Sequence, residues 1–120
     1  MQLQQFEAQV RYQTGIAVID LCGEINGLAE EELDRAYTQA TQDDPRRILL
    51  NFRGATYINS TGLALIVGVL ARARKQHRDV AAFGLSEHYR EIFEITRLAD
   101  FMSIVDDEAS ATMASPVVSP

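Results

Sequence analysis

Apolar and polar residues alternate at the start of the chain with the period of a half-buried strand. The apolar positions of this first run are Phe6, Ala8, Val10 and Tyr12. We expect these even positions to face a core. A turn at Thr14-Gly15 leads to a second apolar run over residues 16–22, which favours a hairpin with the first strand.

Helical and strand-like patterns then alternate along the chain. A helical stripe after Gly27 predicts a helix that ends by Pro45, because proline disfavours helical geometry at the residue before it. Residues 48–52 form an apolar run interrupted only by Asn51, as in a strand buried on both faces, and residues 53–58 are expected to form a loop. Further along we predict a helix from Asn59 or Ser60 to about Gln76, a strand over 79–85, a helix that starts at Ser86, and an edge strand over 101–105.

This order predicts an α/β fold with a mixed sheet of four to five strands, covered mainly on one face by helices. A chain of 120 residues with 47% hydrophobic content is large enough for one domain with its own core. We place that domain over residues 1–110. Residues 106–109 are expected to form a loop or a weak helical turn, and residues 111–120 a disordered tail.

Charge and segment composition exclude several classes of partner. The formal net charge of −6 gives no sign of a nucleic-acid surface, which needs a basic stripe. Residues 1–7 lack the pattern of a signal peptide, and no segment approaches the ~20 apolar residues of a membrane span. We therefore expect a cytoplasmic protein with no membrane or nucleic-acid partner. The single cysteine, Cys22, lies in an apolar run and is expected to be a small buried thiol.

The sequence offers little for catalysis. The two histidines, His77 and His88, have no cysteine or histidine at ligand spacing, so no metal site is expected. Glycine-rich phosphate-binding loops are absent, and Ser60 lacks the flanking glycines of a nucleophile elbow. We expect neither an enzyme nor a bound cofactor. A small-ligand pocket near Gly23 to Asn26 is the least supported alternative.

The segment from Tyr57 to Leu63 is the central feature of the predicted fold. It places two hydroxyl residues and a glycine between an extended segment and a long apolar run, which is how a strand leads into a helix. Asn59 or Ser60 can cap that helix through a side-chain oxygen. A hydroxyl at this point is exposed and lies beside unpaired N–H groups, so it can carry or contact an anion.

The predicted central helix has more apolar residues than one buried face needs. Leu63, Ile66, Val67 and Leu70 form a stripe that can cover the sheet, and this leaves Leu65 and Val69 facing elsewhere. One interpretation is a helix set deep in the core or flanked by its neighbours. The other is a docking surface for a partner, because exposed apolar patches are rare on monomers.

Two motifs make a family resemblance specific. The segment Tyr-Ile-Asn-Ser-Thr-Gly-Leu at residues 57–63 resembles the Asp-Ser-x-Gly-Leu signature of STAS-domain anti-sigma factor antagonists. Gly-Glu-Ile-Asn at residues 23–26 looks like the Gly-Glu-Leu-Asp turn of the same family, at the expected separation. The order of predicted strands and helices from about Phe6 to Val105 also matches. The resemblance covers nearly the whole predicted domain and leaves only the tail outside it.

The resemblance implies a small cytoplasmic switch. In this family the unphosphorylated protein binds an anti-sigma factor that is also a serine kinase, and so releases the sigma factor. Phosphorylation of the motif serine, here Ser60, blocks the binding, and a serine phosphatase restores it. We expect a monomer or weak dimer. The expected partner-binding residues are Asn26, Gly27, Asn59, Ser60, Thr61, Gly62, Leu63, Leu65 and Val69.

Asparagine stands at three positions where the family commonly has aspartate. These are Asn26, Asn51 and Asn59. An amide keeps the capping geometry but carries no charge, so it gives no help in placing a kinase-bound metal ion. The loss of three carboxylates near Ser60 can equally ease a phosphate into the site. The alternative function is a constitutive scaffold that assembles a signalling complex without phosphorylation, with Ser60 acting as a simple helix cap.

Overall fold

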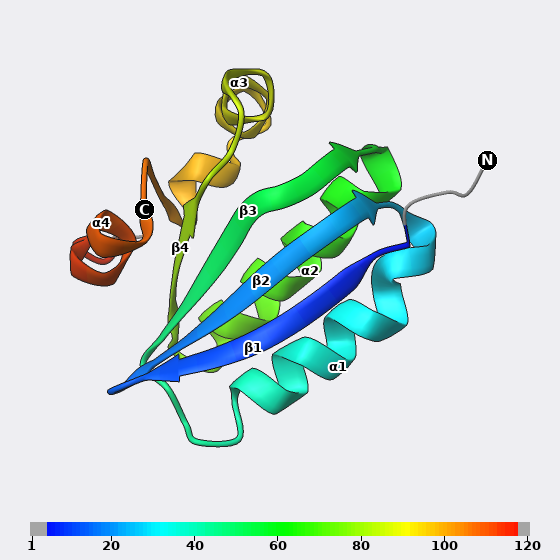
Figure 1. The fold of residues 1–120 in the computed structure, drawn as a ribbon. Helices are drawn as coiled ribbons and strands as arrows, with labels where there is room; N and C mark the ends of the chain where they lie inside the picture. The colour runs from blue at the N-terminus through cyan, green and yellow to red at the C-terminus, as the bar shows by residue number, and fades with distance from the viewer. Residues whose placement is uncertain (1–4, 118–120) are drawn as a thin grey trace.

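The structure, a computed structural model, describes residues 5–117 and shows a single sheet with helices on its two faces (Figure 1). The elements in chain order are β1 Glu7–Gln13, β2 Ile16–Ile25, the 3₁₀ turn η1 Gly27–Ala29, α1 Glu30–Ala40, β3 Arg47–Ile58, α2 Ser60–Lys75, β4 Asp79–Phe83, α3 Glu87–Ile95, the 3₁₀ turn η2 Leu98–Asp100, β5 Ser103–Val105 and α4 Glu108–Met113.

The sheet is mixed, as predicted. Its strand order is β1-β2-β3-β4-β5, with β1 antiparallel to β2 and each later pair parallel. Parallel neighbours need a crossover, and α1, α2 and α3 provide the successive crossovers. The helices α1 and α2 lie along one face, while α4 lies on the other (Figure 1).

Two apolar clusters hold these layers together. The main core lies between the sheet and the helices α1, α2 and α3, and includes Ile19, Tyr37, Leu50, Ile66 and Phe93. The second core lies on the opposite face under α4, and consists of Ile16, Val18, Leu49, Ala81, Phe83 and Ala111. Successive strand residues point to opposite faces, so β2, β3 and β4 contribute to both cores. This explains the near-continuous apolar run at residues 48–52.

The strand β3 is longer than the sequence predicted. Residues 53–58, expected to be a loop, continue the strand and pair with the end of β2. The register between β2 and β3 shifts twice, between Asp20 and Cys22 and between Gly23 and Glu24. Each shift adds a residue on β3 and interrupts the alternation of apolar and polar positions. The prediction of a loop was wrong because the bulges hide the strand pattern.

The predicted tail was wrong for residues 111–113, which belong to α4. The Asp107 side chain caps this helix by accepting a hydrogen bond from Ser110 N, and Ala111 is fully buried. The buried Arg47 guanidinium donates to the carbonyl oxygens of Ala111 and Thr112, both at 3.0 Å. Residues 114–117 have no regular secondary structure, and the rest of the predicted tail, 118–120, lies outside the described residues.

Several other expectations need correction. Cys22 is exposed rather than buried, because its neighbour Leu21 takes the inward position of β2 and turns Cys22 to the opposite face. Tyr12, at the end of β1, is exposed, whereas Phe6 and Ala8 are buried as predicted. The last two strands are shorter than expected, since β4 ends at Phe83 and β5 begins at Ser103.

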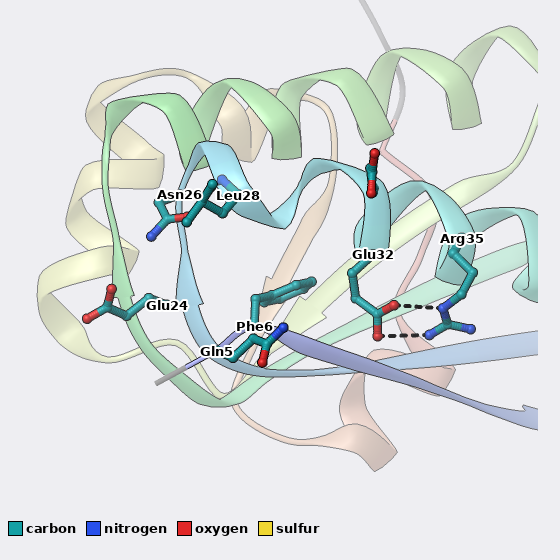
Figure 2. A pocket seen from close by; sticks show the side chains of 8 residues that line it. Gln5, Phe6, Glu24, Asn26, Leu28, Glu32 and Arg35 are labelled. Carbon is teal, nitrogen blue, oxygen red and sulfur yellow. Dashed lines mark hydrogen bonds and ion pairs between the residues drawn. The ribbon is translucent and has the colours of Figure 1, made fainter. Parts of the chain in front are cut away.

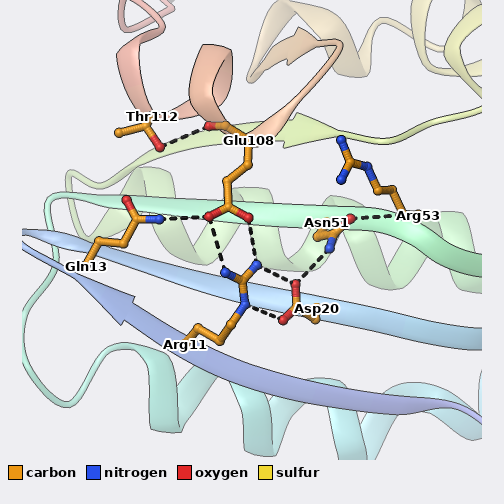
Figure 3. Close-up of polar contacts among 7 residues, drawn as sticks. All are labelled: Arg11, Gln13, Asp20, Asn51, Arg53, Glu108 and Thr112. Carbon is orange, nitrogen blue, oxygen red and sulfur yellow. Dashed lines mark hydrogen bonds and ion pairs between the residues drawn. The ribbon is translucent and has the colours of Figure 1, made fainter.

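A polar network joins α4 to the second face of the sheet (Figure 3). The Arg11 guanidinium donates to both carboxylate oxygens of Asp20, at 2.6 and 2.9 Å, and to both of Glu108, at 3.2 and 2.8 Å. Asn51 Nδ2 donates to Asp20 at 2.8 Å, and Asn51 Oδ1 accepts from Arg53 N at 3.0 Å. The hydrogen bond from Arg11, assisted by that from Asn51, lowers the pKa of Asp20.

The first turn of α2 approaches β2 so closely that only glycine fits. A Cβ atom on Gly62 would lie 1.8 Å from the carbonyl oxygen of Ile25, which is a backbone atom and cannot swing aside. Gly68, on the same helix, has no neighbouring atom within 4 Å of such a Cβ. The two glycines therefore have different reasons to be in α2. None of the helices in residues 5–117 has the length and apolar character for crossing a membrane.

We predict opposite effects of alanine at the two glycines. Gly62→Ala should destabilise the protein by about 2 kcal/mol or more, because the added methyl group forces α2 away from Ile25. Gly68→Ala should stabilise it by about 1 kcal/mol, the difference in helix propensity at an exposed position. Urea denaturation measures both changes. Equal stabilities of the two variants would contradict the close contact.

We also predict opposite effects of a carboxylate at two asparagines. Asn51→Asp should cost about 2 kcal/mol at pH 7, because it removes a donor to Asp20 and sets a second carboxylate beside it. Asn59→Asp should be neutral or stabilising by up to about 1 kcal/mol, because its side-chain oxygen caps the positive end of α2.

For Asn51→Asp, urea denaturation at pH 7 and near pH 4 separates the loss of the hydrogen-bond donor from the repulsion between the two carboxylates. Repulsion raises the pKa of the carboxylate pair in Asn51→Asp, so the extra cost is present where both groups are ionised and shrinks as the pH falls toward about 4. A cost for Asn51→Asp that is the same at both pH values would rule out carboxylate repulsion as its cause.

Candidate functional site

Ser60 is exposed and is the first residue of α2. The preceding residue, Asn59, has an extended backbone and caps the helix by accepting a hydrogen bond from Gly62 N at 2.8 Å. The sequence left Asn59 and Ser60 as alternative caps, and the structure assigns this role to Asn59. The Ser60 hydroxyl therefore stands at the N-terminal end of a helix without being needed to cap it.

The strand-to-helix corner at Ile58 to Ser60 is fixed from two directions. On one side Asn59 N donates to the carbonyl oxygen of Ile25, at the end of β2, at 3.2 Å. On the other side Ile58 N donates to the hydroxyl oxygen of Tyr89, from α3, at 2.9 Å. Tyr89 was not predicted to be part of the site, since the contact joins residues 31 positions apart and leaves no local pattern.

The turn between β2 and α1 lies beside this corner. A Cβ atom on Gly27 would lie 3.4 Å from the Thr61 methyl group, so the two segments are in contact range. The Asn26 side chain accepts a hydrogen bond from Leu28 N at 2.9 Å and caps the turn η1. The structure thus brings together the two motif segments, residues 23–26 and 57–63, as the predicted partner surface requires. Next to them Leu28 is 90% exposed.

The apolar residues of α2 are arranged differently from the prediction. Val69 was expected to face away from the sheet, but it is buried in the main core and cannot contact a partner. Val67 was placed on the buried stripe, but its side chain is 46% exposed. Leu63 and Leu65 are both half-buried against the main core. The buried stripe is in fact Gly62, Ile66, Val69, Leu70 and Ala73.

The outer side of α2 is therefore small and weakly apolar. Its exposed residues begin at Ser60 and Thr61 and continue along one side of the helix. We refer to them as the α2 face, which consists of Ser60, Thr61, Ala64, Val67, Gly68 and Ala71. The first turn of α2 contains no acidic residue, and its last turn carries Arg72, Arg74 and Lys75. The positive charges at the C-terminal end of α2 interact favourably with the helix dipole. The N-terminal end of α2 has no carboxylate of its own.

Asn51 does not belong to this site. The sequence grouped it with Asn26 and Asn59 near Ser60, but it lies on the opposite face of the sheet, bonded to Asp20 (Figure 3). It precedes Ile58 by seven positions on β3, or roughly 20 Å along the strand. The prediction was wrong because a carboxylate position in a motif does not reveal which face of the strand it occupies.

A cavity of about 610 Å³ opens beside the β2–α1 turn (Figure 2). Its lining residues are Gln5, Phe6, Glu24, Asn26, Leu28, Glu31, Glu32 and Arg35. The Glu32 carboxylate accepts from Arg35 Nε at 2.7 Å and from Ala8 N at 3.1 Å, and the hydrogen bond from Arg35 lowers the pKa of Glu32. Glu32 is thus an ionised, fully engaged carboxylate and a poor proton acceptor at neutral pH.

The described residues offer no centre for metal chemistry. Within residues 5–117 no group of three or more His, Cys, Asp and Glu side chains is placed to hold a metal ion. No histidine in the described part of the chain is hydrogen-bonded to the exposed hydroxyl of Ser60, which lies at a helix terminus. The geometry suits recognition of the surface around Ser60 or its modification by another protein.

Comparisons with known proteins agree with this arrangement. The family described as "STAS domain" matches residues 7–111. The anti-sigma-B factor antagonist of Staphylococcus aureus (strain NCTC 8325 / PS 47) is 34% identical over 82 residues, which are 68% of this chain and 76% of that protein.

Solved structures give the same fold. An anti-sigma factor antagonist from Mycobacterium paratuberculosis has a TM-score of 0.78 at 16% identity, covering 91% of this chain and 92% of that one. The Bacillus cell fate determinant SpoIIAA in its phosphorylated form has a TM-score of 0.67 at 20% identity, covering 91% and 98%. The match over residues 7–111, the S. aureus relative and the shared fold lead to one conclusion: the chain belongs to the STAS domain family.

Proposed function

We propose that this protein is an anti-sigma factor antagonist, a cytoplasmic switch that binds an anti-sigma factor with serine kinase activity. In this proposal the kinase phosphorylates Ser60 and loses its hold on the protein, and a serine phosphatase restores binding. The observation that carries the proposal is the exposed Ser60 at the first position of α2, capped by Asn59 rather than by its own side chain. Relatives named anti-sigma-B factor antagonist support the choice of partner.

The domain is suited to carry a phosphate at this point. Phosphorylation of Ser60 adds about −1.5 to −2 charges, and the N-terminal end of a helix favours a negative charge. The cap provided by Asn59 stays in place, since Ser60 contributes no bond to it. Neither Asn26 nor Asn59 brings a carboxylate to repel the new charge. We therefore expect the fold to remain intact when Ser60 is phosphorylated.

The proposed docking surface joins the α2 face to the β2–α1 turn. The exposed Gly27 lies next to Thr61, and the half-buried Asn26 precedes it in the turn. The half-buried Leu63 and Leu65 belong to the first two turns of α2. Val67 replaces Val69 in the surface that we proposed from sequence. A phosphate buried in such a contact loses its hydration or is repelled by negative charges of the partner, and both lower the affinity. Each ~1.4 kcal/mol of lost binding free energy weakens binding tenfold.

The second candidate is a scaffold that is not phosphorylated. The uncharged Asn26 and Asn59 favour it, because the family motif usually has aspartate at these positions and a kinase can use such a carboxylate to help place its metal ion. In this case the same surface would hold a signalling partner permanently. Ser60→Ala and Ser60→Asp, which mimic the unphosphorylated and phosphorylated states, then have equal effects on partner binding.

We predict that Ser60→Asp weakens partner binding at least tenfold, whereas Ser60→Ala binds like the wild type. The reason is that only the first substitution places a charge in the contact. A pull-down with the wild type and both variants identifies the anti-sigma factor, and titration calorimetry with that purified protein measures the affinities. Incubation with the anti-sigma factor kinase, ATP and magnesium followed by mass spectrometry should locate phosphate on Ser60, with Thr61→Ala as the control for its exposed neighbour.

Equal affinities of Ser60→Ala and Ser60→Asp, with no phosphate on Ser60, would reject the switch and favour the scaffold.

We also predict that Val67→Glu weakens partner binding at least tenfold without changing thermal stability. Val67 is 46% exposed at the middle of the α2 face, so a carboxylate there stays in solvent in the free protein but is buried in the complex. Ile95→Glu is the matched control, since Ile95 is 71% exposed on α3. Weakening of binding by Ile95→Glu and not by Val67→Glu would place the partner on another surface.

A further inference from the structure

Among the residues that the structure describes, none forms a strand beside the second half of β3 on the β4 side. The ladder between β3 and β4 ends at the pair of Asn51 and Phe83, while β3 continues to Ile58. After Phe83 the chain turns through Gly84 into the loop before α3. Backbone N–H groups on this edge of β3 need other partners, because an unpaired buried donor is costly.

Tyr89 supplies the partner for the last of these donors. Its hydroxyl oxygen accepts the hydrogen bond from Ile58 N at 2.9 Å, across 31 residues of sequence. The Tyr89 ring packs against the main core, and its own backbone N–H donates to the capping Ser86 Oγ. Further along α3, Phe93 meets Phe52 of β3 edge to face, with ring centroids 5.6 Å apart. The hydroxyl is thus held by a helix that is itself anchored on β3.

The hydrogen bond from Ile58 N to the Tyr89 hydroxyl fixes the backbone just before the proposed phosphorylation site. Ile58 is followed directly by the cap Asn59 and by Ser60. Asn59 N is bonded to Ile25 of β2, so the corner is held between β2 on one side and α3 on the other. Without the Tyr89 hydroxyl, the backbone of the corner keeps its hydrogen bond to β2 but loses the one to α3, and only the packing of the buried Ile58 side chain still links the end of β3 to α3.

The surroundings of the hydroxyl separate positioning from stability. A cavity of about 240 Å³ borders Tyr89, Ile58 and the loop residues Gly84 to Ser86. Water can therefore reach Ile58 N when the hydroxyl is removed, and it satisfies the donor without fixing it to α3. Loss of the hydroxyl should leave the fold in place but loosen the corner.

We propose that Tyr89 is a positioning residue of the Ser60 site, which acts through Ile58 and makes α3 part of the switch. By fixing the end of β3, its hydroxyl holds the Ser60 hydroxyl in the geometry that the kinase uses. This inference rests on the proposed phosphorylation of Ser60. It assigns to α3 a role in the rate of phosphorylation rather than in contact with the partner.

Tyr89→Phe tests the inference, with Tyr12→Phe as the matched control. Tyr12 also uses its hydroxyl to bond the backbone, by donating to the carbonyl oxygen of Gln39 at 2.8 Å, but it does so on β1, away from α3. By NMR hydrogen exchange, the Ile58 amide should exchange at least tenfold faster in Tyr89→Phe than in the wild type. It should be unchanged in Tyr12→Phe.

Phosphorylation kinetics with the anti-sigma factor kinase, ATP and magnesium give the second measurement. Tyr89→Phe should lower kcat about fivefold with KM unchanged, because the docking surface is intact and only the reacting hydroxyl is less well placed. A purely structural defect would instead raise KM, since part of the substrate would be unfolded, and leave kcat unchanged.

The possible failures are distinguishable. If the wild type is phosphorylated on Ser60 and Tyr89→Phe has the kcat or the Ile58 exchange rate of Tyr12→Phe, the role of Tyr89 is refuted and the proposed function stands. If the wild type receives no phosphate on Ser60, the proposed function fails and the inference fails with it.

Discussion

The contact between Gly62 and the carbonyl of Ile25 determines how the central helix meets the sheet. Because no side chain separates them, the first turn of α2 lies directly on the end of β2. The same carbonyl accepts the hydrogen bond from Asn59 N, so one backbone atom orients both the cap and the first turn. The β2–α1 turn is thereby brought to the helix terminus. A composite surface forms from segments that are more than 30 residues apart.

The two faces of the sheet differ in what their contacts do. On the face under α4, Arg11 joins Asp20 to Glu108, and the buried Arg47 binds the last carbonyls of α4. These bonds close the second core and contribute to stability. On the other face, α2 buries one side in the main core and leaves its outer side in solvent. Substitutions on the α2 face therefore leave the bonds that hold the sheet and α4 together in place.

Local patterns in the sequence predicted most of the strands and helices and the exposed hydroxyl at the start of α2. The Asn-Ser-Thr-Gly segment marks a helix N-terminus, and the apolar run at residues 48–52 marks a central strand, because each signal lies within a few neighbouring residues. The order of elements, the mixed sheet and the exposed Ser60 follow from such signals.

The features that the sequence did not reveal depend on register and on distant contacts. Two bulges hide the end of β3. The buried stripe of α2 is rotated around the helix axis relative to the predicted one, so that Val69 is buried and Val67 is exposed. A stripe at three- and four-residue spacing fits either rotation, so periodicity alone does not decide between them. The Tyr89 hydrogen bond and the position of Asn51 on the far face require the folded sheet.

Under the proposed function, the rigidity of the corner decides how a phosphate acts. The dipole of α2 favours a charge at Ser60 by only about 1 kcal/mol, so the modification changes the free domain little. If the corner were loose, the phosphate could swing away from a docked partner and much of the repulsion would be relieved. Because Ile58 is bonded to α3 and Asn59 to β2, the charge stays at the end of the α2 face. A fixed charge imposes its desolvation cost on the complex, which is why a small rigid domain can switch partners without changing its conformation.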